Sequence, residues 1–254
     1  MKKRILDAGE LRTYKLGVNG SDHEEWEKAN ELLQKDNIKL EMVEFSDYVK
    51  PNEALEDGEI DLNAFQTEIY FNNFVKERGY TDLGILAYTQ VAPMGIYSSK
   101  YKSLDEATGH LIIAIPNDVT NGGRALKFLE KNGFLTLKKE AGLTPTVMDI
   151  EKYNKDVEIV EMVATQIPAS LPDLSFACIN NGVAKDAGLT LKNDAIVYED
   201  YKEPDMKNYW NIIAAKKDRI ESEDFQKIKK AYNSDEVKQV ILEHYDGQSI
   251  PVWD

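Results

Sequence analysis

The chain has 254 residues, of which 42% are hydrophobic and 30% charged, so it can bury a substantial core as one large domain or two smaller ones. The formal net charge of -14, with acids spread along the chain and no basic block, argues against nucleic acid or an anionic bilayer as a partner. No apolar stretch approaches the roughly 20 residues needed to span a bilayer. The single cysteine, Cys178, excludes an internal disulfide and is expected to be a buried thiol.

Strands and helices alternate along the chain. Short apolar or alternating runs predict strands at residues 14–18, 38–45, 61–64, 83–91, 94–98, 111–115, 157–163, 176–179 and 210–215. Apolar residues at helical spacing predict helices at residues 21–35, 51–57, 67–78, 124–131, 167–171, 183–187, 223–232 and 234–245. Ser21 or Asp22 is expected to cap the first helix, and Gly79 to end the third. This alternation predicts mostly parallel sheets covered by helices.

Two α/β blocks follow one another without a linker rich in proline or glycine, which indicates lobes joined by crossing strands. The crossings are expected near residues 91–98 and 197–211. Lobe 1 is then discontinuous, with residues 1–94 and 206–254, and lobe 2 holds residues 95–205. A cleft between two such lobes is a usual place for a small ligand.

A segment rich in glycine, NDVTNGGRAL at residues 117–126, lies between a predicted buried strand and a predicted helix. Thr120 is expected to cap that helix, whose bare N-terminal amides favour an anion. Gly122 and Gly123 are expected to leave the backbone open to a ligand. No phosphate-loop motif is present, so a carboxylate is the expected anion.

Asn121 and Arg124 are three residues apart and therefore share a helix face. The amide of Asn121 would bind the polar end of a ligand, while the guanidinium of Arg124 would bind both oxygens of its carboxylate in two parallel hydrogen bonds. The alternative is that the glycines only form a tight turn and Arg124 pairs with a surface acid. The local spacing favours neither interpretation.

Several motifs, in the same order along the chain, resemble the methionine-binding lipoproteins of ABC importers. They are VEFSDYVKPN, GEIDLNAFQTEIYF, PMGIYSSKYKSLDE, AIPNDVTNGGRALKFLEKNG, TQIPASL and AYNSDEVKQVILEHYDGQSIP. The resemblance extends from about Lys15 to the C-terminus. It implies an α/β, two-lobed periplasmic binding protein type II fold with the ligand in the interlobe cleft.

The resemblance also implies the binding residues. Asn121 and Arg124 match the N-x-x-R motif with which relatives hold the ligand's polar end. Tyr48, Phe65 and Tyr70 would surround its side chain, where a thioether gains about 0.3–1.5 kcal/mol per good aromatic contact.

Asn211, in YWNII, matches a polar hinge position. Each contact has an ordinary alternative: Phe65 and Tyr70 as core residues, Tyr48 as a hydrophobic staple, and Asn211 as the partner of a strand end.

Two departures from the family pattern touch the presumed specificity residues. Thr67 stands where the family usually has histidine. Gly182 and Val183 stand where it usually has asparagine and an aromatic residue, and Asn181 can replace that asparagine only if the backbone rearranges. The expected ligand is therefore methionine or a related apolar amino acid with a free carboxylate. A methionine-containing dipeptide, or a non-transport ligand-sensing module of the same fold, is the alternative.

No catalytic arrangement is visible: Cys178 has no adjacent base, and neither GxSxG nor HExxH occurs. His23, His110 and His244 show no metal-ligand spacing, so neither a metal nor a cofactor is expected. Binding without catalysis is the better account.

The resemblance further implies an ABC permease as the membrane partner, and we expect a monomer. Relatives are attached to the outside of the cytoplasmic membrane through a lipidated N-terminal cysteine, and here no cysteine precedes Lys15. The chain is therefore interpreted as a soluble, truncated mature form of an extracytoplasmic, lipid-anchored protein.

Overall fold

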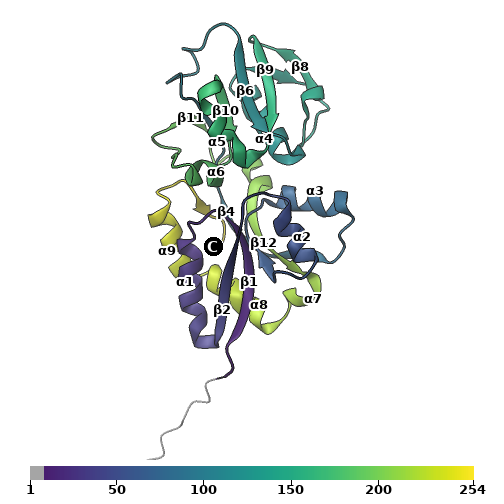
Figure 1. Cartoon of the computed structure of the whole chain (residues 1–254), viewed down its shortest axis with the longest axis vertical. Helices are drawn as coiled ribbons and strands as arrows, with labels where there is room; N and C mark the ends of the chain where they lie inside the picture. The colour runs from purple at the N-terminus through teal and green to yellow at the C-terminus, as the bar shows by residue number, and fades with distance from the viewer. Residues whose placement is uncertain (1–8) are drawn as a thin grey trace, which may run out of the picture.

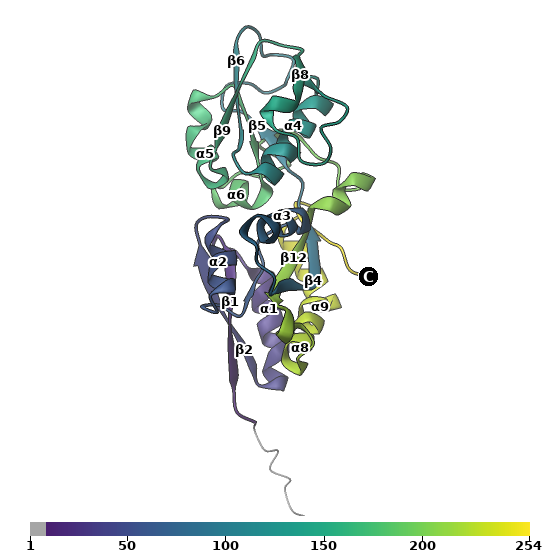
Figure 2. The same cartoon turned by 90° about the vertical axis from the view of Figure 1, so that its right-hand side faces the viewer.

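The computed structural model describes residues 9–254. Residues 1–8, which the sequence analysis assigned to lobe 1 and to a truncated N-terminus, lie outside the described residues. The described chain forms two lobes stacked along the long axis of the molecule (Figures 1 and 2). Each lobe is built around its own β-sheet.

Lobe 1 contains a six-stranded sheet in the order β13-β4-β12-β3-β1-β2. Its strands are β1 (Arg12–Asn19), β2 (Ile38–Phe45), β3 (Leu62–Asn63), β4 (Leu83–Val91), β12 (Trp210–Lys216) and β13 (Ile250–Pro251). Its helices are α1 (Glu24–Leu33), α2 (Lys50–Glu56), α3 (Glu68–Arg78), α7 (Lys217–Ile220), α8 (Glu223–Tyr232) and α9 (Asp235–His244).

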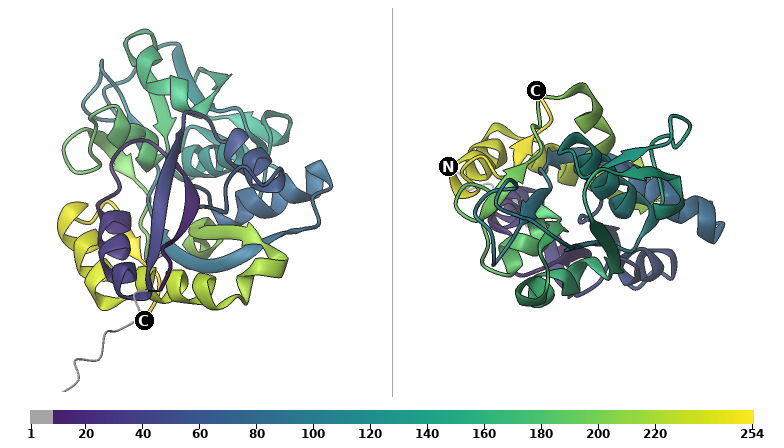
Figure 3. Two further views of the ribbon diagram at one scale, coloured as in Figure 1. Left: turned by 60° about the horizontal axis from the view of Figure 1, so that its bottom comes forward. Right: turned by 90° about the horizontal axis from the view of Figure 1, so that it is seen from above.

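Successive side chains of β12 point to opposite faces of the sheet, into the two hydrophobic cores of lobe 1. Ile213 points into a core shared with α1, α8 and α9, and Ile212 points into a core shared with α2 and α3. The sheet therefore has helices on both faces. Figure 3 shows the C-terminal helices beside α1, although they come from opposite ends of the chain.

Lobe 2 contains a five-stranded sheet in the order β11-β5-β10-β6-β9 and a separate pair, β7-β8. The strands are β5 (Gly95–Tyr97), β6 (Leu111–Pro116), β7 (Leu135–Leu137), β8 (Ile150–Tyr153), β9 (Val157–Met162), β10 (Phe176–Ile179) and β11 (Ala195–Tyr198). The helices are α4 (Val119–Lys131), α5 (Ile167–Ser170) and α6 (Asn181–Asp186). Cys178, on β10, is a fully buried free thiol, as expected.

Short 3-10 turns join several elements of both lobes. They are η1 (Gln34–Asp36), η2 (Val147–Asp149), η3 (Ala164–Gln166), η4 (Leu171–Asp173) and η5 (Pro204–Tyr209).

The chain passes between the two sheets twice, from β4 to β5 through residues 92–94 and back from β11 to β12 through residues 199–209. Both crossings fall where the sequence analysis expects them. The lobe boundaries at residues 94/95 and 205/206 stay a prediction.

The prediction of mostly parallel sheets is wrong, because both large sheets are mixed. The β1–β2, β1–β3, β6–β9 and β6–β10 pairs are parallel. Within the described chain, each antiparallel pair of the large sheets includes β4, β5 or β12, the strands next to a crossing. The chain leaves lobe 1 along β4 and returns along β12, so these two strands run in opposite directions.

The cap predicted for the first helix is also wrong. The N-cap of α1 is His23, and neither Ser21 nor Asp22 caps the helix. The carboxylate of Asp22 instead contacts Nε2 of His244 at 2.8 Å, near the end of α9. Thr67 and Gly79, in contrast, do bound α3: the Thr67 hydroxyl accepts from the amide of Tyr70, and Gly79 adopts the left-handed conformation with φ 68.

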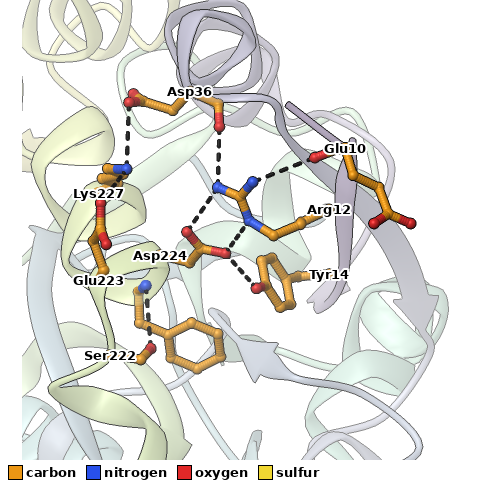
Figure 4. Close-up of polar contacts among 9 residues, drawn as sticks. Glu10, Arg12, Tyr14, Asp36, Ser222, Glu223, Asp224 and Lys227 are labelled. Carbon is orange, nitrogen blue, oxygen red and sulfur yellow. Dashed lines mark hydrogen bonds and ion pairs between the residues drawn. The ribbon is translucent and has the colours of Figure 1, made fainter. Parts of the chain in front are cut away.

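An ion-pair network fastens α8 to the start of β1 (Figure 4). Asp224 accepts from Nε and Nη2 of Arg12 at 2.6 and 2.9 Å and from the hydroxyl of Tyr14 at 2.5 Å. Arg12 also donates to the main-chain oxygen of Asp36 at 3.1 Å. The hydrogen bond from Arg12 lowers the pKa of Asp224 below its ordinary value.

Candidate ligand-binding site

A cavity of about 690 Å³ lies between the lobes and is lined by residues of both. Its volume is within the range of about 300–1,000 Å³ that is typical of small-molecule sites. The structure brings every binding residue named in the sequence analysis to the wall of this cavity: Tyr48, Phe65, Thr67, Tyr70, Asn121, Arg124, Asn181 and Asn211. Their contact with a ligand stays a prediction.

The helix that carries Arg124 begins earlier than the sequence indicates. Asp118, and not Thr120, caps α4, because its Oδ1 accepts from the amide of Asn121 at 2.8 Å. The hydroxyl of Thr120 also donates to this oxygen, at 3.0 Å. Asp118 therefore supplies the negative charge at this helix end, where the sequence analysis places a ligand carboxylate. Arg124 lies on the second turn of the helix, beyond the N-terminal amides.

Gly122 and Gly123 serve packing within the protein and do not open the backbone to a ligand. A Cβ atom on Gly122 would lie 2.7 Å from the main-chain oxygen of Pro116. One on Gly123 would lie 3.0 Å from the main-chain oxygen of Pro145. The glycines thus allow α4 to pack directly against the end of β6 and a neighbouring loop, which corrects the sequence-based expectation.

Arg124 forms a buried ion pair with Glu199, a residue that the sequence analysis does not single out. Nε of Arg124 lies 3.0 and 3.1 Å from the two carboxylate oxygens, and Nη2 lies 2.6 Å from Oε2. Nη2 also donates to the main-chain oxygen of Ala92 at 2.9 Å, and the ring of Tyr209 lies against the guanidinium, 4.3 Å from Cζ.

The side chains of Arg124 and Glu199 are only 4% and 10% exposed. The alternative interpretation is therefore right that Arg124 pairs with an acid, but wrong that the acid lies on the surface. Hydrogen bonds to residues 9–254 occupy Nε and Nη2 and leave Nη1 available.

Asparagine side chains line the wall near Arg124. Asn121 donates to both carboxylate oxygens of Asp118, at 3.1 Å each, and its own oxygen accepts from Asn180 at 2.8 Å. Asn181 donates across the cleft to the main-chain oxygen of Gln248 at 2.8 Å. Within the part of the chain that the structure describes, the buried Oδ1 atoms of Asn180 and Asn181 have no donor. Asn180 is a further cavity residue that the sequence analysis missed, although it directly precedes Asn181.

Three aromatic rings form another part of the wall. The ring centroids of Tyr48, Phe65 and Tyr70 lie 6.0–6.2 Å apart. The hydroxyl of Tyr70 donates to the main-chain oxygen of Tyr48 at 2.7 Å, which fixes the two segments relative to each other. Burial raises the pKa of both tyrosines well above the ordinary value, so both hydroxyls are neutral at physiological pH.

The two departures from the family pattern have different structural settings. The hydroxyl of Thr67 caps α3, and the backbone of this residue forms an isolated antiparallel β-bridge with Asn211 of β12. Thr67 therefore serves the local fold. At Gly182, a Cβ atom would meet nothing within 4 Å. Gly182 is exposed and belongs to the cavity wall, so a Cβ atom there would extend into open space.

The cavity also has a charged end at which the lobes meet. Lys185 of α6 lies 3.4 Å from the carboxylate of Asp22 in lobe 1. Glu25, only 5% exposed, accepts from the hydroxyl of Tyr245 at 2.5 Å, and burial raises its pKa. Among residues 9–254, no group of three or more histidine, cysteine, aspartate or glutamate side chains is arranged to hold a metal ion.

Comparisons with known proteins agree with this architecture. The family model described as NlpA lipoprotein matches residues 14–253. The D-methionine-binding lipoprotein MetQ of Escherichia coli K12 is 40% identical over 94% of this chain and 88% of the relative.

Solved structures give the same result. A nutrient-binding protein from Burkholderia cenocepacia bound to methionine has a TM-score of 0.89 at 35% identity, covering 94% of this chain and all (100%) of that one. The substrate-binding protein of a methionine transporter from Streptococcus pneumoniae has a TM-score of 0.88 at 38% identity, covering 95% and 96%. The two-lobed periplasmic binding protein fold predicted from the sequence is thereby confirmed. The chain belongs to the NlpA lipoprotein family.

Proposed function

We propose that this protein is the substrate-binding component of an ABC importer, which captures methionine or a related apolar amino acid between its lobes and delivers it to a membrane permease. The observation that carries the proposal is that a single cavity combines a cation, unpaired acceptors and an aromatic wall. These three features match the carboxylate, the ammonium group and the side chain of an apolar amino acid.

The polar end of the ligand is matched by Arg124 and the asparagines. The free Nη1 of Arg124 donates to the ligand carboxylate, in a charge-assisted hydrogen bond within a largely buried site. The Oδ1 atoms of Asn180 and Asn181 accept from the ligand ammonium. Each of these oxygens is buried without a donor, and leaving such an acceptor unsatisfied costs about 1–3 kcal/mol. A ligand that supplies the donors removes this penalty.

The apolar end is matched by the rings of Tyr48, Phe65 and Tyr70. A thioether beside such rings gains about 0.3–1.5 kcal/mol per contact beyond its hydrophobic burial. The same wall accepts other apolar side chains at lower affinity. The open space at Gly182 accommodates a ligand somewhat larger than methionine, so a methionine-containing dipeptide is the second candidate.

Binding proceeds by closure of the two lobes and involves no catalysis. The cavity walls come from both lobes, so only a closed cleft engages both halves of the ligand. Contacts across the cleft, from Asn181 to Gln248 and from Lys185 to Asp22, stabilise the closed form. The closed form then docks on the permease and releases its cargo there.

The relatives are lipoproteins, and a similar solved structure is the substrate-binding protein of a methionine transporter, which supports an extracytoplasmic location outside the cytoplasmic membrane. Across residues 9–254, every helix falls short of the length or hydrophobicity that crossing a bilayer requires. We propose that the natural precursor carries an N-terminal lipid anchor and that the protein acts as a monomer.

Native mass spectrometry of the purified protein, followed by calorimetry against a panel of amino acids, tests this function. The panel contains both enantiomers of methionine, norleucine, leucine, glutamate, and dipeptides with methionine at either end. We expect methionine or a methionine dipeptide to bind most tightly and norleucine, which lacks the sulfur, to bind more weakly. No binding by any member of the panel would refute the proposal.

Replacing Phe65 with alanine tests the role of the aromatic wall. The variant should lose most of the preference for methionine over norleucine, because the sulfur then has fewer ring contacts. Phe74→Ala, on α3 and outside the cavity wall, should lower stability and leave this preference unchanged.

A further inference from the structure

Glu199 connects the cavity to both crossings between the lobes. It lies at the start of the return crossing, directly after β11. Its Oε2 accepts from the amide of Met94 at 2.7 Å, and its own amide donates to the main-chain oxygen of Met94 at 3.0 Å. Met94 belongs to the other crossing. The carboxylate that holds Arg124 is thus itself held in place by the backbone of the interlobe connection.

The contacts of Arg124 determine which edge of its guanidinium faces the cavity. Glu199 occupies Nε and Nη2, Ala92 accepts a second hydrogen bond from Nη2, and Tyr209 covers one face of the group. A free arginine side chain has many rotamers, and ordering it costs conformational entropy. The ion pair removes this cost before the ligand arrives, and it also provides a counter-charge for a guanidinium that is only 4% exposed.

We propose that Glu199 is the positioning residue for carboxylate recognition: it orients Arg124 so that Nη1 faces the ligand. The inference rests on the proposed function, since it assigns the ligand carboxylate to Arg124. Glu199 itself does not line the cavity, so a ligand bound there would contact Arg124 and not Glu199. Its effect on binding therefore operates through the orientation of Arg124.

A purely structural role for Glu199 makes a different prediction from a positioning role. If Glu199 only stabilises the fold, its loss weakens the binding of every ligand to the same extent. If it positions Arg124, its loss weakens the binding of ligands with a carboxylate and spares those without one. The ratio of the affinities for L-methionine and L-methioninamide separates the two roles, because the amide keeps the side chain and the ammonium but lacks the carboxylate.

The experiment measures this ratio by calorimetry or competition in the full chain and its variants. In Glu199→Gln, the amide nitrogen faces another donor in either orientation: Nε of Arg124 if it takes the Oε1 position, or both Nη2 of Arg124 and the amide of Met94 if it takes the Oε2 position. The pair therefore loses at least one hydrogen bond as well as its charge. We expect the preference for methionine over methioninamide to fall about tenfold or more, the loss expected for a hydrogen bond to a charged group. The affinity for methioninamide should stay near the wild-type value.

Glu199→Asp is the second variant and covers the case in which the glutamine variant does not fold. It keeps the negative charge but is one methylene shorter, so it cannot contact both Arg124 and Met94 as Glu199 does. A reduced preference in this variant as well supports positioning over a mere counter-charge. The matched control is Asp224→Asn, which breaks the Arg12 ion pair of lobe 1 outside the cavity wall (Figure 4). It should leave the ratio unchanged.

Two results would overturn the proposal in distinguishable ways. If the wild-type protein shows no preference for methionine over its amide, the carboxylate site at Arg124 is wrong and the role of Glu199 is refuted with it. If the wild type shows the preference and both Glu199 variants retain it, the proposed function stands and only the positioning role is refuted.

Discussion

The side chain of Asn181 faces two ways: its Nδ2 donates across the cleft to the main-chain oxygen of Gln248 at 2.8 Å, whereas its buried Oδ1 has no donor among residues 9–254. The same amide thus joins the two lobes and, as we propose, offers an acceptor to the ligand. These two roles are separable by experiment, because one depends on the ligand's ammonium group and the other does not.

Asn181→Ala is expected to weaken the binding of L-methionine by about tenfold or more, the loss that follows removal of a hydrogen bond to a charged group. Binding of 4-(methylthio)butanoate, which lacks the ammonium, should weaken less. Calorimetry with both ligands measures the difference. Gln248→Ala is the control: it keeps the main-chain acceptor of Asn181 but removes the contact of its own side chain with Leu191 in lobe 2, so both ligands should be affected alike.

Arg124→Met is expected to cost on the order of 2–5 kcal/mol in ligand binding, because it removes the guanidinium that would pair with the ligand carboxylate in a buried site. It should also lower the free energy of unfolding by about 3–5 kcal/mol, since Glu199 is then buried without a counter-charge. The double variant Arg124→Met/Glu199→Leu should recover much of the stability and none of the affinity. Urea unfolding and calorimetry measure the two quantities. A double variant no more stable than the single one would contradict this account of the pair.

Two helical glycines should respond to alanine in opposite directions. Gly182→Ala on α6 meets nothing within 4 Å and should raise stability by up to about 1 kcal/mol, because alanine loses less backbone entropy in a helix. Gly122→Ala on α4 forces a Cβ atom to within 2.7 Å of the main-chain oxygen of Pro116 and should destabilise by about 1–3 kcal/mol. Equal effects of the two substitutions in urea unfolding would show that packing against Pro116 is not the reason for a glycine at residue 122.

Asp224 should make the stability of lobe 1 depend on pH in the acid range. Its hydrogen bond with Arg12 lowers the pKa in the folded state below the ordinary 3.8, so the unfolded chain binds its proton more readily. The stabilisation is fully present above pH 3.8 and is lost as the pH falls through the lower, folded-state pKa. Asp224→Asn should flatten this part of the pH profile of urea unfolding.

Glu221→Gln is the control for the Asp224 variant. Glu221 is exposed, precedes the same helix and makes no ion pair within the part of the chain that the structure describes. Its substitution should leave the acid limb of the pH profile unchanged. A profile that Asp224→Asn also leaves unchanged would show that the Arg12 pair contributes nothing in this pH range.

Local periodicity predicts the regular elements of this protein well. The strands at residues 38–45 and 83–91 have the predicted bounds: the first alternates apolar and polar residues, and the second is a short, largely apolar run. The start and end of α3 are also predicted, since Thr67 and Gly79 act through local backbone chemistry. Elements of only a few residues, such as β7, β11 and β13, were missed because so short a run shows no periodicity.

The features of the site that the sequence does not reveal depend on contacts between residues far apart along the chain. Glu199 is 75 positions away from Arg124, and nothing in its neighbours marks it as a buried counter-charge. Asp118 and Thr120 are both suitable caps by composition, and only the extended backbone at Asp118 selects it. The family resemblance placed the binding residues near one another, but their hydrogen bonds depend on the packing of two lobes.

The way lobe 1 is assembled also has a consequence for the order in which the lobes fold when the chain emerges N-terminus first. The core of that lobe joins α1 to α8 and α9, and the rings of Trp26 and Tyr232 lie 4.4 Å apart. The five-stranded sheet, in contrast, uses only residues between Gly95 and Tyr198. As the chain emerges from the ribosome or from an export channel, the later-starting lobe therefore has all its strands first, while the N-terminal segment keeps an exposed apolar face until the last helices emerge. This interval is when a chain of this architecture most needs a chaperone.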